Sequence, residues 1–77
     1  MNKHRNEISA AEQAYLLAIR QSRGGPPLSA ADLARRMRVS PQATSEMLRR
    51  LAGVGLVSIG EARDVCLTAK GNDEADA

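Results

Sequence analysis

Residues 41–51 carry several polar side chains that could make directed hydrogen bonds from one side of a helix. Gln42, Ser45, Glu46 and Arg49 lie at the i, i+3, i+4 and i+7 spacing of one helical face, and all are polar. Gln pairs naturally with adenine, Glu with the amino group of cytosine, and Arg with guanine. The candidate base contacts are Gln42, Ala43, Ser45, Glu46 and Arg49.

The same stretch has a second face that suits a protein core. Thr44, Met47, Leu48 and Leu51 repeat the helical spacing with mostly apolar side chains, and Ser40-Pro41 is a good helix start. We therefore predict a helix over 41–51. Taken alone, the pattern fits an ordinary amphipathic surface helix better than a DNA-reading one, and only the neighbouring elements change that interpretation.

Basic residues are numerous around this helix. The chain has 11 Lys and Arg against 9 Asp and Glu, and nine of the 11 are Arg, whose planar guanidinium suits phosphate and guanine. Three acids fall in residues 72–77, so residues 1–71 carry a formal charge of +5. The candidate phosphate contacts are Arg35, Arg36, Arg38, Ser40, Arg50 and Arg63.

Two further helices are predicted before the helix at 41–51. Ser9 and Glu12 have capping-box spacing, and apolar residues follow at Ala11, Ala14, Tyr15, Ala18 and Ile19, until Gly and Pro at 24–27 end the helix. Ser29 and Asp32 repeat the start signal for a helix over 30–37, whose Leu33, Ala34 and Met37 face inward. A short turn then leads to residue 41. Helix, short turn and helix together form a helix-turn-helix.

A β-hairpin is predicted after the helices. Residues 56–59 and 65–68 alternate as strands around a polar turn at 60–64, near whose tip Arg63 lies. The expected fold is mainly α with this small hairpin: a winged helix-turn-helix of three helices and a two-stranded wing, with an aliphatic core. We expect this domain to occupy residues 8–71, between a mobile arm (1–7) and an acidic, frayed tail (72–77).

Several stretches resemble the DNA-binding domain of the iron- and manganese-dependent repressors, the diphtheria toxin repressor family. The stretches are 28–34, 39–44, 47–51, 55–57 and 67–71. The Gly-Leu-Val and Leu-Thr-x-x-Gly elements also occur in the multiple-antibiotic-resistance regulators, but the short wing favours the metalloregulators. The family's helix-one metal ligand corresponds to Ala14, and its later ligand-bearing helices are missing. The resemblance thus implies DNA reading with no metal and no cofactor.

Other functions find little support in the sequence. The single cysteine, Cys66, falls in a predicted strand and is expected to pack, and His4 lies in the arm without partners at ligand spacing. No group of residues suggests catalysis, so we do not expect an enzyme. No apolar run has transmembrane length and no signal peptide is recognisable, which favours the cytoplasm without membrane contact.

The sequence therefore predicts sequence-specific binding of double-stranded DNA, in the service of transcription regulation. Helix 41–51 would enter the major groove, with the 57–68 hairpin as wing. Two copies are expected to pair as a homodimer, on DNA if not in free solution, because one short helix reads too few base pairs. The alternative is a winged-helix module for protein–protein interaction, because Glu46 would repel phosphate unless it met a base donor.

Overall fold

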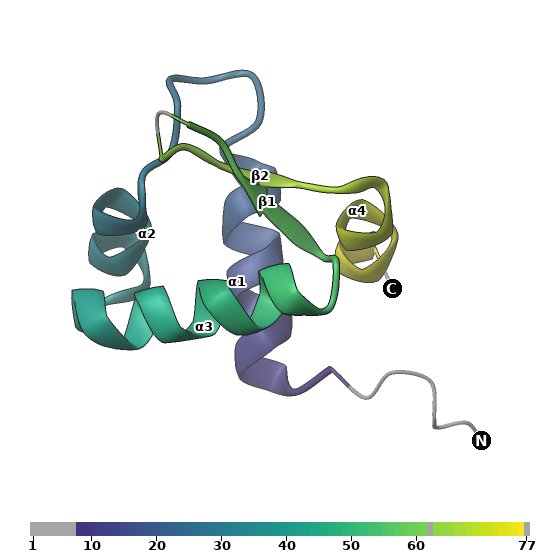
Figure 1. Ribbon diagram of the computed structural model, residues 1–77, viewed down its shortest axis with the longest axis horizontal. Coiled ribbons are helices and arrows are strands. Elements are labelled where there is room, and N and C mark those ends of the chain that lie inside the picture. Colours follow the sequence, from purple (N-terminus) through teal and green to yellow (C-terminus); the bar gives the residue numbers. More distant parts are fainter. Residues whose placement is uncertain (1–7, 62, 77) are drawn as a thin grey trace.

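The computed structural model describes residues 8–61 and 63–76, and within them the chain forms four helices and one hairpin (Figure 1). In chain order these are α1 (Ala10–Gln21), α2 (Ala30–Met37), α3 (Pro41–Gly53), β1 (Val57–Ile59), β2 (Val65–Leu67) and α4 (Ala69–Asp76). The predicted winged helix-turn-helix is confirmed, with one helix more than expected. The arm predicted over 1–7 lies outside the described residues.

The helices begin where the capping signals stand. In α1 the Ser9 side chain accepts from the Glu12 backbone N–H, and the Glu12 carboxylate accepts from the Ser9 N–H. Ser29 and Asp32 make the same reciprocal pair in α2. Such a box satisfies two backbone N–H groups that the first helical turn leaves without partners. Ser40 caps α3, and Pro41 occupies its first position.

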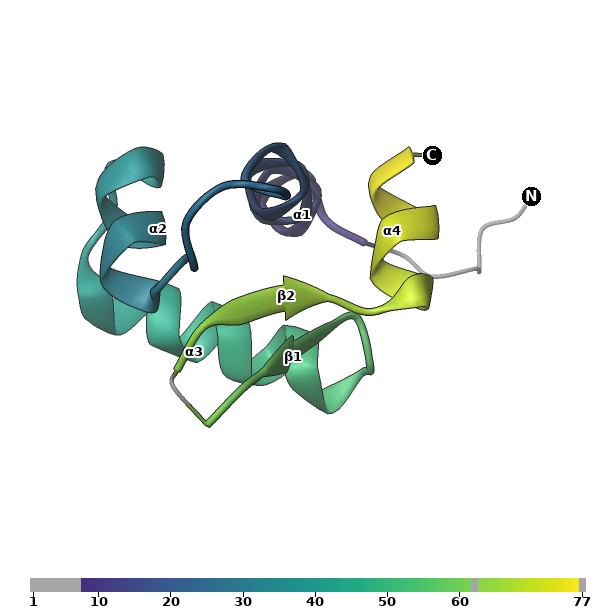
Figure 2. The ribbon, with the colours of Figure 1, turned by 90° about the horizontal axis from the view of Figure 1, so that it is seen from above.

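Helix α1 runs through the middle of the domain, between α2 and α4 (Figures 1 and 2). It contacts α2, α4 and strand β2, so its buried side is broader than a single stripe. Leu16 is fully buried together with Tyr15 and Ile19, although it was absent from the predicted inward face. Ala11 and Ala14, which we placed on that face, are exposed instead. The long side chains fill the space between the neighbouring elements.

The core is aliphatic, as predicted, apart from the buried Tyr15. In α3, Thr44, Leu48 and Leu51 are buried and Met47 is half-buried; in α2, Leu33 and Ala34 are buried and Met37 is half-buried. Helices α2 and α3 pack against each other and are joined by a short turn, and together these fix the angle between the two helices. In α2 and α3, the apolar stripes predicted from the sequence are therefore the ones that face the core.

The hairpin is antiparallel, with Val57 opposite Leu67 and Ile59 opposite Val65. The segment before α2 joins it through a bridge between Ser29 and Asp64 and a hydrogen bond from Val65 N–H to Leu28 O (2.8 Å). The wing is thereby tied to the start of α2 as well as to α3.

The acidic tail is helical up to Asp76, so the prediction that 72–77 frays is wrong for the part that is described. Thr68 caps α4, since its Oγ1 accepts from Gly71 N–H at 3.0 Å. Gly71 lies so close to the residue that precedes β1 that an added Cβ would be 2.0 Å from Leu56 O. At the far end, the Gln13 side chain donates to the carbonyls of Glu74 and Ala75, and Ala75 is buried. These anchors lie partly outside the tail, which is why its own composition did not reveal them.

Candidate nucleic-acid interface

Helix α3 presents one face to the core and the other to solvent. Its 13 residues give a rod roughly 20 Å long. All five predicted base contacts (Gln42, Ala43, Ser45, Glu46 and Arg49) are exposed. The chain thus holds a helix on the surface with its hydrogen-bonding groups directed away from the fold.

Two contacts fix α3 against α1. The Tyr15 hydroxyl lies 3.4 Å from Thr44 Oγ1 in the buried interface, and Arg50 Nη1 lies 3.6 Å from Glu12 Oε2. Glu12 also belongs to the capping box of α1, so one carboxylate connects the start of α1 to α3. The sequence pattern identified the capping role but gave no sign of the link to Arg50, which joins residues far apart in the chain.

The turn between α2 and α3 contains a basic residue in a conformation that favours glycine. Arg38 ends α2 with φ 61° and ψ 43°, in the left-handed region, and its side chain is exposed. Ser40, two residues later, uses its Oγ to accept from Ala43 N–H (3.1 Å). Its hydroxyl hydrogen can still donate to an outside acceptor.

The wing carries a second arginine of this kind. Arg63 has φ 66° and is exposed in the turn, where its backbone N–H donates to the Gly60 carbonyl at 2.8 Å.

A groove of about 550 Å³ lies between the start of α2, helix α3 and the wing. Arg49, Arg63 and Ser45 line it together with Ile59, which is 48% exposed. Sequence reasoning did not identify this groove, because its walls come from three separate elements.

The other predicted phosphate contacts already have partners inside the fold. Arg36 donates to Ser22 Oγ (2.6 Å) and to Ala18 O (3.4 Å), which ties α2 to the end of α1. Arg50 pairs with Glu12, as described above, and Arg35 pairs with Asp32 one turn earlier. By contrast, Arg38, Arg49 and Arg63 have no side-chain hydrogen bond or ion pair within residues 8–61 and 63–75. These three guanidinium groups belong to the turn between α2 and α3, to α3 itself and to the wing.

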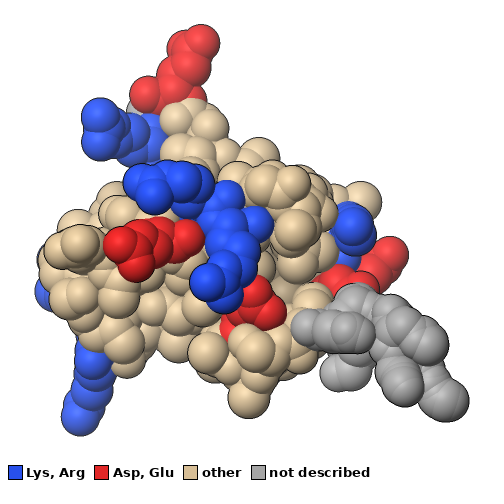
Figure 3. All heavy atoms as spheres, turned by 60° about the horizontal axis from the view of Figure 1, so that its bottom comes forward, with Lys and Arg blue, Asp and Glu red and all other residues tan. Residues whose placement is uncertain are grey.

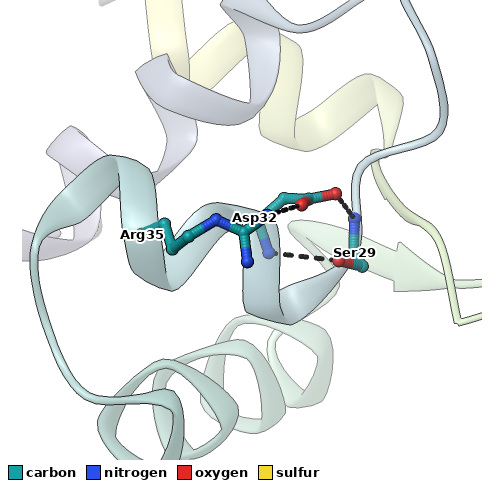
Figure 4. Close-up of polar contacts among 3 residues, drawn as sticks. All are labelled: Ser29, Asp32 and Arg35. Carbon is teal, nitrogen blue, oxygen red and sulfur yellow. Dashed lines mark hydrogen bonds and ion pairs between the residues drawn. The ribbon is translucent and has the colours of Figure 1, made fainter.

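The Asp32 carboxylate is held by several groups at the start of α2 (Figure 4). It accepts from Ser29 N–H at 3.3 Å and from the Arg35 guanidinium. The hydrogen bonds from the Ser29 backbone and side chain, followed by the charge of Arg35, lower the pKa of Asp32 below its usual 3.8. This carboxylate stays ionised at neutral pH and keeps Arg35 occupied.

Charge is unevenly spread over this side of the molecule. Figure 3 shows basic side chains gathered across the middle of the side on which α3 lies, with acidic side chains next to them. The exposed acid of α3 itself is Glu46. The surface is therefore mixed rather than uniformly positive, and an anionic partner would have to be met in a defined orientation.

Other kinds of site are not apparent. Across the described chain, no cluster of three or more His, Cys, Asp and Glu could hold a metal ion. Cys66 is exposed, with its Sγ 3.8 Å from Asp64 Oδ2, so the expectation that it packs is wrong. Cys66 lies on the exposed face of β2, whereas its neighbours Val65 and Leu67 face the core. None of the helices described has the length and apolar character needed to cross a membrane.

Comparison with known proteins places these features in a family. The MarR family model matches residues 8–64. The MarR family protein Rv2887 of Mycobacterium tuberculosis is 36% identical, with a TM-score of 0.77 over 90% of this chain and 50% of that protein. The structure of Rv2887 in complex with DNA also gives 36% identity, with a TM-score of 0.76 over 90% of this chain and 51% of that protein. The reduced form of MarR from E. coli is 27% identical, with a TM-score of 0.82 over 91% and 50%. A search among curated proteins gives no match.

The chain thus spans about half the length of these solved relatives. The expected membership of the iron- and manganese-dependent repressors is wrong. The elements that suggested it serve winged-helix packing: Gly71 makes room for the Leu56 carbonyl, and Thr68 caps α4. Any winged helix needs such packing, and the length of the wing did not separate the two families. The chain belongs to the MarR family and has its winged-helix fold.

Proposed function

We propose that this chain binds double-stranded DNA, with α3 in the major groove and the wing against the backbone, as the DNA-reading part of a transcription regulator. One observation carries the proposal. The three arginines without partners in the described chain, Arg38, Arg49 and Arg63, lie in the turn, the exposed face of α3 and the wing. The relative Rv2887 forms a complex with DNA at 36% identity, which supports this interpretation.

The proposed contacts fall into two groups. Base edges would be read by the exposed residues of α3: Gln42, Ala43, Ser45, Glu46 and Arg49. Phosphates would be bound by Arg38, Arg63 and the Ser40 hydroxyl, which set the register of the helix but carry no sequence information. Arg35, Arg36 and Arg50 are left out, because each already has a partner in the fold.

Two copies are proposed to bind one operator. A helix of this length reads only a few base pairs, too few to specify a genomic site, and a two-fold pair doubles the sequence read. Half-sites would then be separated by about 10 base pairs or a multiple of this. A protein with this function would work in the cytoplasm, together with the DNA that it regulates.

The test compares two variants that lose the same charge. The first, Arg38→Ala/Arg49→Ala/Arg63→Ala, removes the unpartnered guanidinium groups; the second, Arg23→Ala/Arg35→Ala/Lys70→Ala, removes three cations that have partners in the fold. Fluorescence anisotropy with a duplex of random sequence, at about 0.15 M salt where distant charges are screened, gives the affinities.

The first variant should lose at least tenfold in affinity, and the second should stay within about threefold of the parent chain. Circular dichroism checks that both are folded. Equal losses would mean that only net charge attracts DNA. Absence of duplex binding by the parent chain, even at low salt, would contradict the proposal and favour a protein-interaction module.

A further inference from the structure

Glu46 is a carboxylate that the fold leaves unneutralised on the exposed face of α3. A Glu followed four residues later by an Arg normally forms a helical ion pair, and Arg50 occupies that position. The Arg50 guanidinium instead contacts Glu12 of α1, at 3.6 Å. Arg49, three residues after Glu46, forms no ion pair with it, and neither does any other described cation.

An unpaired carboxylate in a DNA interface restricts which bases can be accommodated. An ionised carboxylate only accepts hydrogen bonds. In the major groove guanine presents two acceptors and thymine one, so both repel it, whereas adenine presents a donor beside an acceptor. Cytosine presents only its N4 amino donor at this edge. Of the four bases, cytosine therefore suits Glu46 best.

Resting on the proposed DNA-binding function, we infer that Glu46 is a specificity-determining residue that selects cytosine at one position of each half-site. Arg49 follows three residues later, which is a rise of about 4.5 Å along the helix. Base pairs are spaced by about 3.4 Å, so the two side chains reach the same or adjacent base pairs. Arg49 would donate to guanine O6 and N7 there, which makes the half-site contain a cytosine with a guanine beside it or paired to it.

The experiment selects bound duplexes from a random pool with four forms of the chain. These are the parent, Glu46→Ala, Glu46→Gln and the control Asp73→Asn, which neutralises an exposed acid of α4. Affinities are then measured on the selected site and on the same site with its cytosine replaced by each other base.

The parent and Asp73→Asn should prefer cytosine at one position by about tenfold. Glu46→Ala should lose that preference and bind non-selected duplexes several-fold more tightly, because repulsion from phosphate is removed. Glu46→Gln should change the preference to adenine, since an amide pairs with adenine N6 and N7.

Two failures are distinguishable. If the parent chain binds duplex DNA but Glu46→Ala selects the same bases at every position, the inference about Glu46 is overturned and the proposed function stands. If the parent chain binds no duplex DNA, the proposed function itself fails.

Discussion

The hydroxyl of Tyr15 lies 3.4 Å from Thr44 Oγ1, in a buried contact that joins α1 to α3. Both side chains are almost inaccessible to solvent, and a buried polar group that loses its partner is costly. The contact is long for a hydrogen bond between hydroxyls, so its net contribution should be modest.

Replacing either partner should lower the free energy of unfolding. Tyr15→Phe and Thr44→Val should each cost about 1 kcal/mol, and the double variant should cost less than the sum by about 0.5–1 kcal/mol. Urea unfolding of the four proteins gives this coupling energy. Strictly additive losses would show that the two hydroxyls do not interact.

Gly71 should not tolerate a side chain. An alanine Cβ there would lie 2.0 Å from Leu56 O, a backbone atom that also accepts from Thr68 N–H at 3.1 Å. Gly71→Ala should therefore lower the unfolding free energy by about 3 kcal/mol, as severe overpacking does. Gly53→Ala is the matched control: nothing lies within 4 Å of its added Cβ, so it should be neutral or stabilise by up to about 1 kcal/mol. Equal melting temperatures for the two variants would contradict this packing.

The contribution of Asp32 to stability should disappear in acid. Hydrogen bonds from Ser29 lower its pKa in the folded chain, so the unfolded chain binds the proton more readily. The stabilisation is complete above the pKa that Asp32 has in the unfolded chain. It is lost as the pH falls through the pKa that Asp32 has in the folded chain, and the loss begins below about pH 5. Denaturant unfolding of the parent and Asp32→Asn should differ at pH 7, and the gap should narrow in acid. Asp73→Asn controls for the loss of a charge. A gap independent of pH would rule out this role of Asp32.

The backbone conformations of Arg38 and Arg63 should lower the stability of the fold, while their side chains contribute to DNA binding. Arg38 and Arg63 have φ of 61° and 66°, a conformation that glycine adopts more readily. Arg38→Gly and Arg63→Gly should each raise the unfolding free energy by about 1 kcal/mol. Each should also weaken binding to all duplex sequences and reduce the slope of log K against log salt by about 0.9. Arg35→Gly, inside α2, should instead destabilise by about 1 kcal/mol. If either left-handed variant gains stability without losing affinity, that arginine does not contact phosphate.

The features of this fold that could be predicted from the sequence are those that depend on neighbouring residues. Ser9, Ser29 and Ser40 start helices because a side-chain oxygen satisfies N–H groups in the next turn, and no distant residue is needed for this. The faces of α2 and α3 followed from helical periodicity for the same reason. Helix α4 was missed although Thr68 is a local cap, because residues 72–77 have no apolar stripe and the carbonyls of Glu74 and Ala75 accept from Gln13, at the other end of the chain.

The candidate interface was predictable only in part. The exposed face of α3 follows from periodicity, but which arginines remain available depends on tertiary contacts. Arg36 and Arg50 look equivalent to Arg38 in the sequence, yet the first two contact Ser22 and Glu12 across the fold. The family could not be predicted from the motifs, because Gly71 and Thr68 serve packing that different winged-helix families share.

DNA reading by α3 can be tested directly by an NMR titration of the ¹⁵N-labelled chain with duplex DNA at low salt. Backbone amide shifts should change along α3, in the turn at Arg38 and in the wing at Arg63, while those of α4 stay unchanged, and added salt should reverse the changes. Shifts confined to α1 and α4, or no shift at any DNA concentration, would contradict DNA reading by this surface.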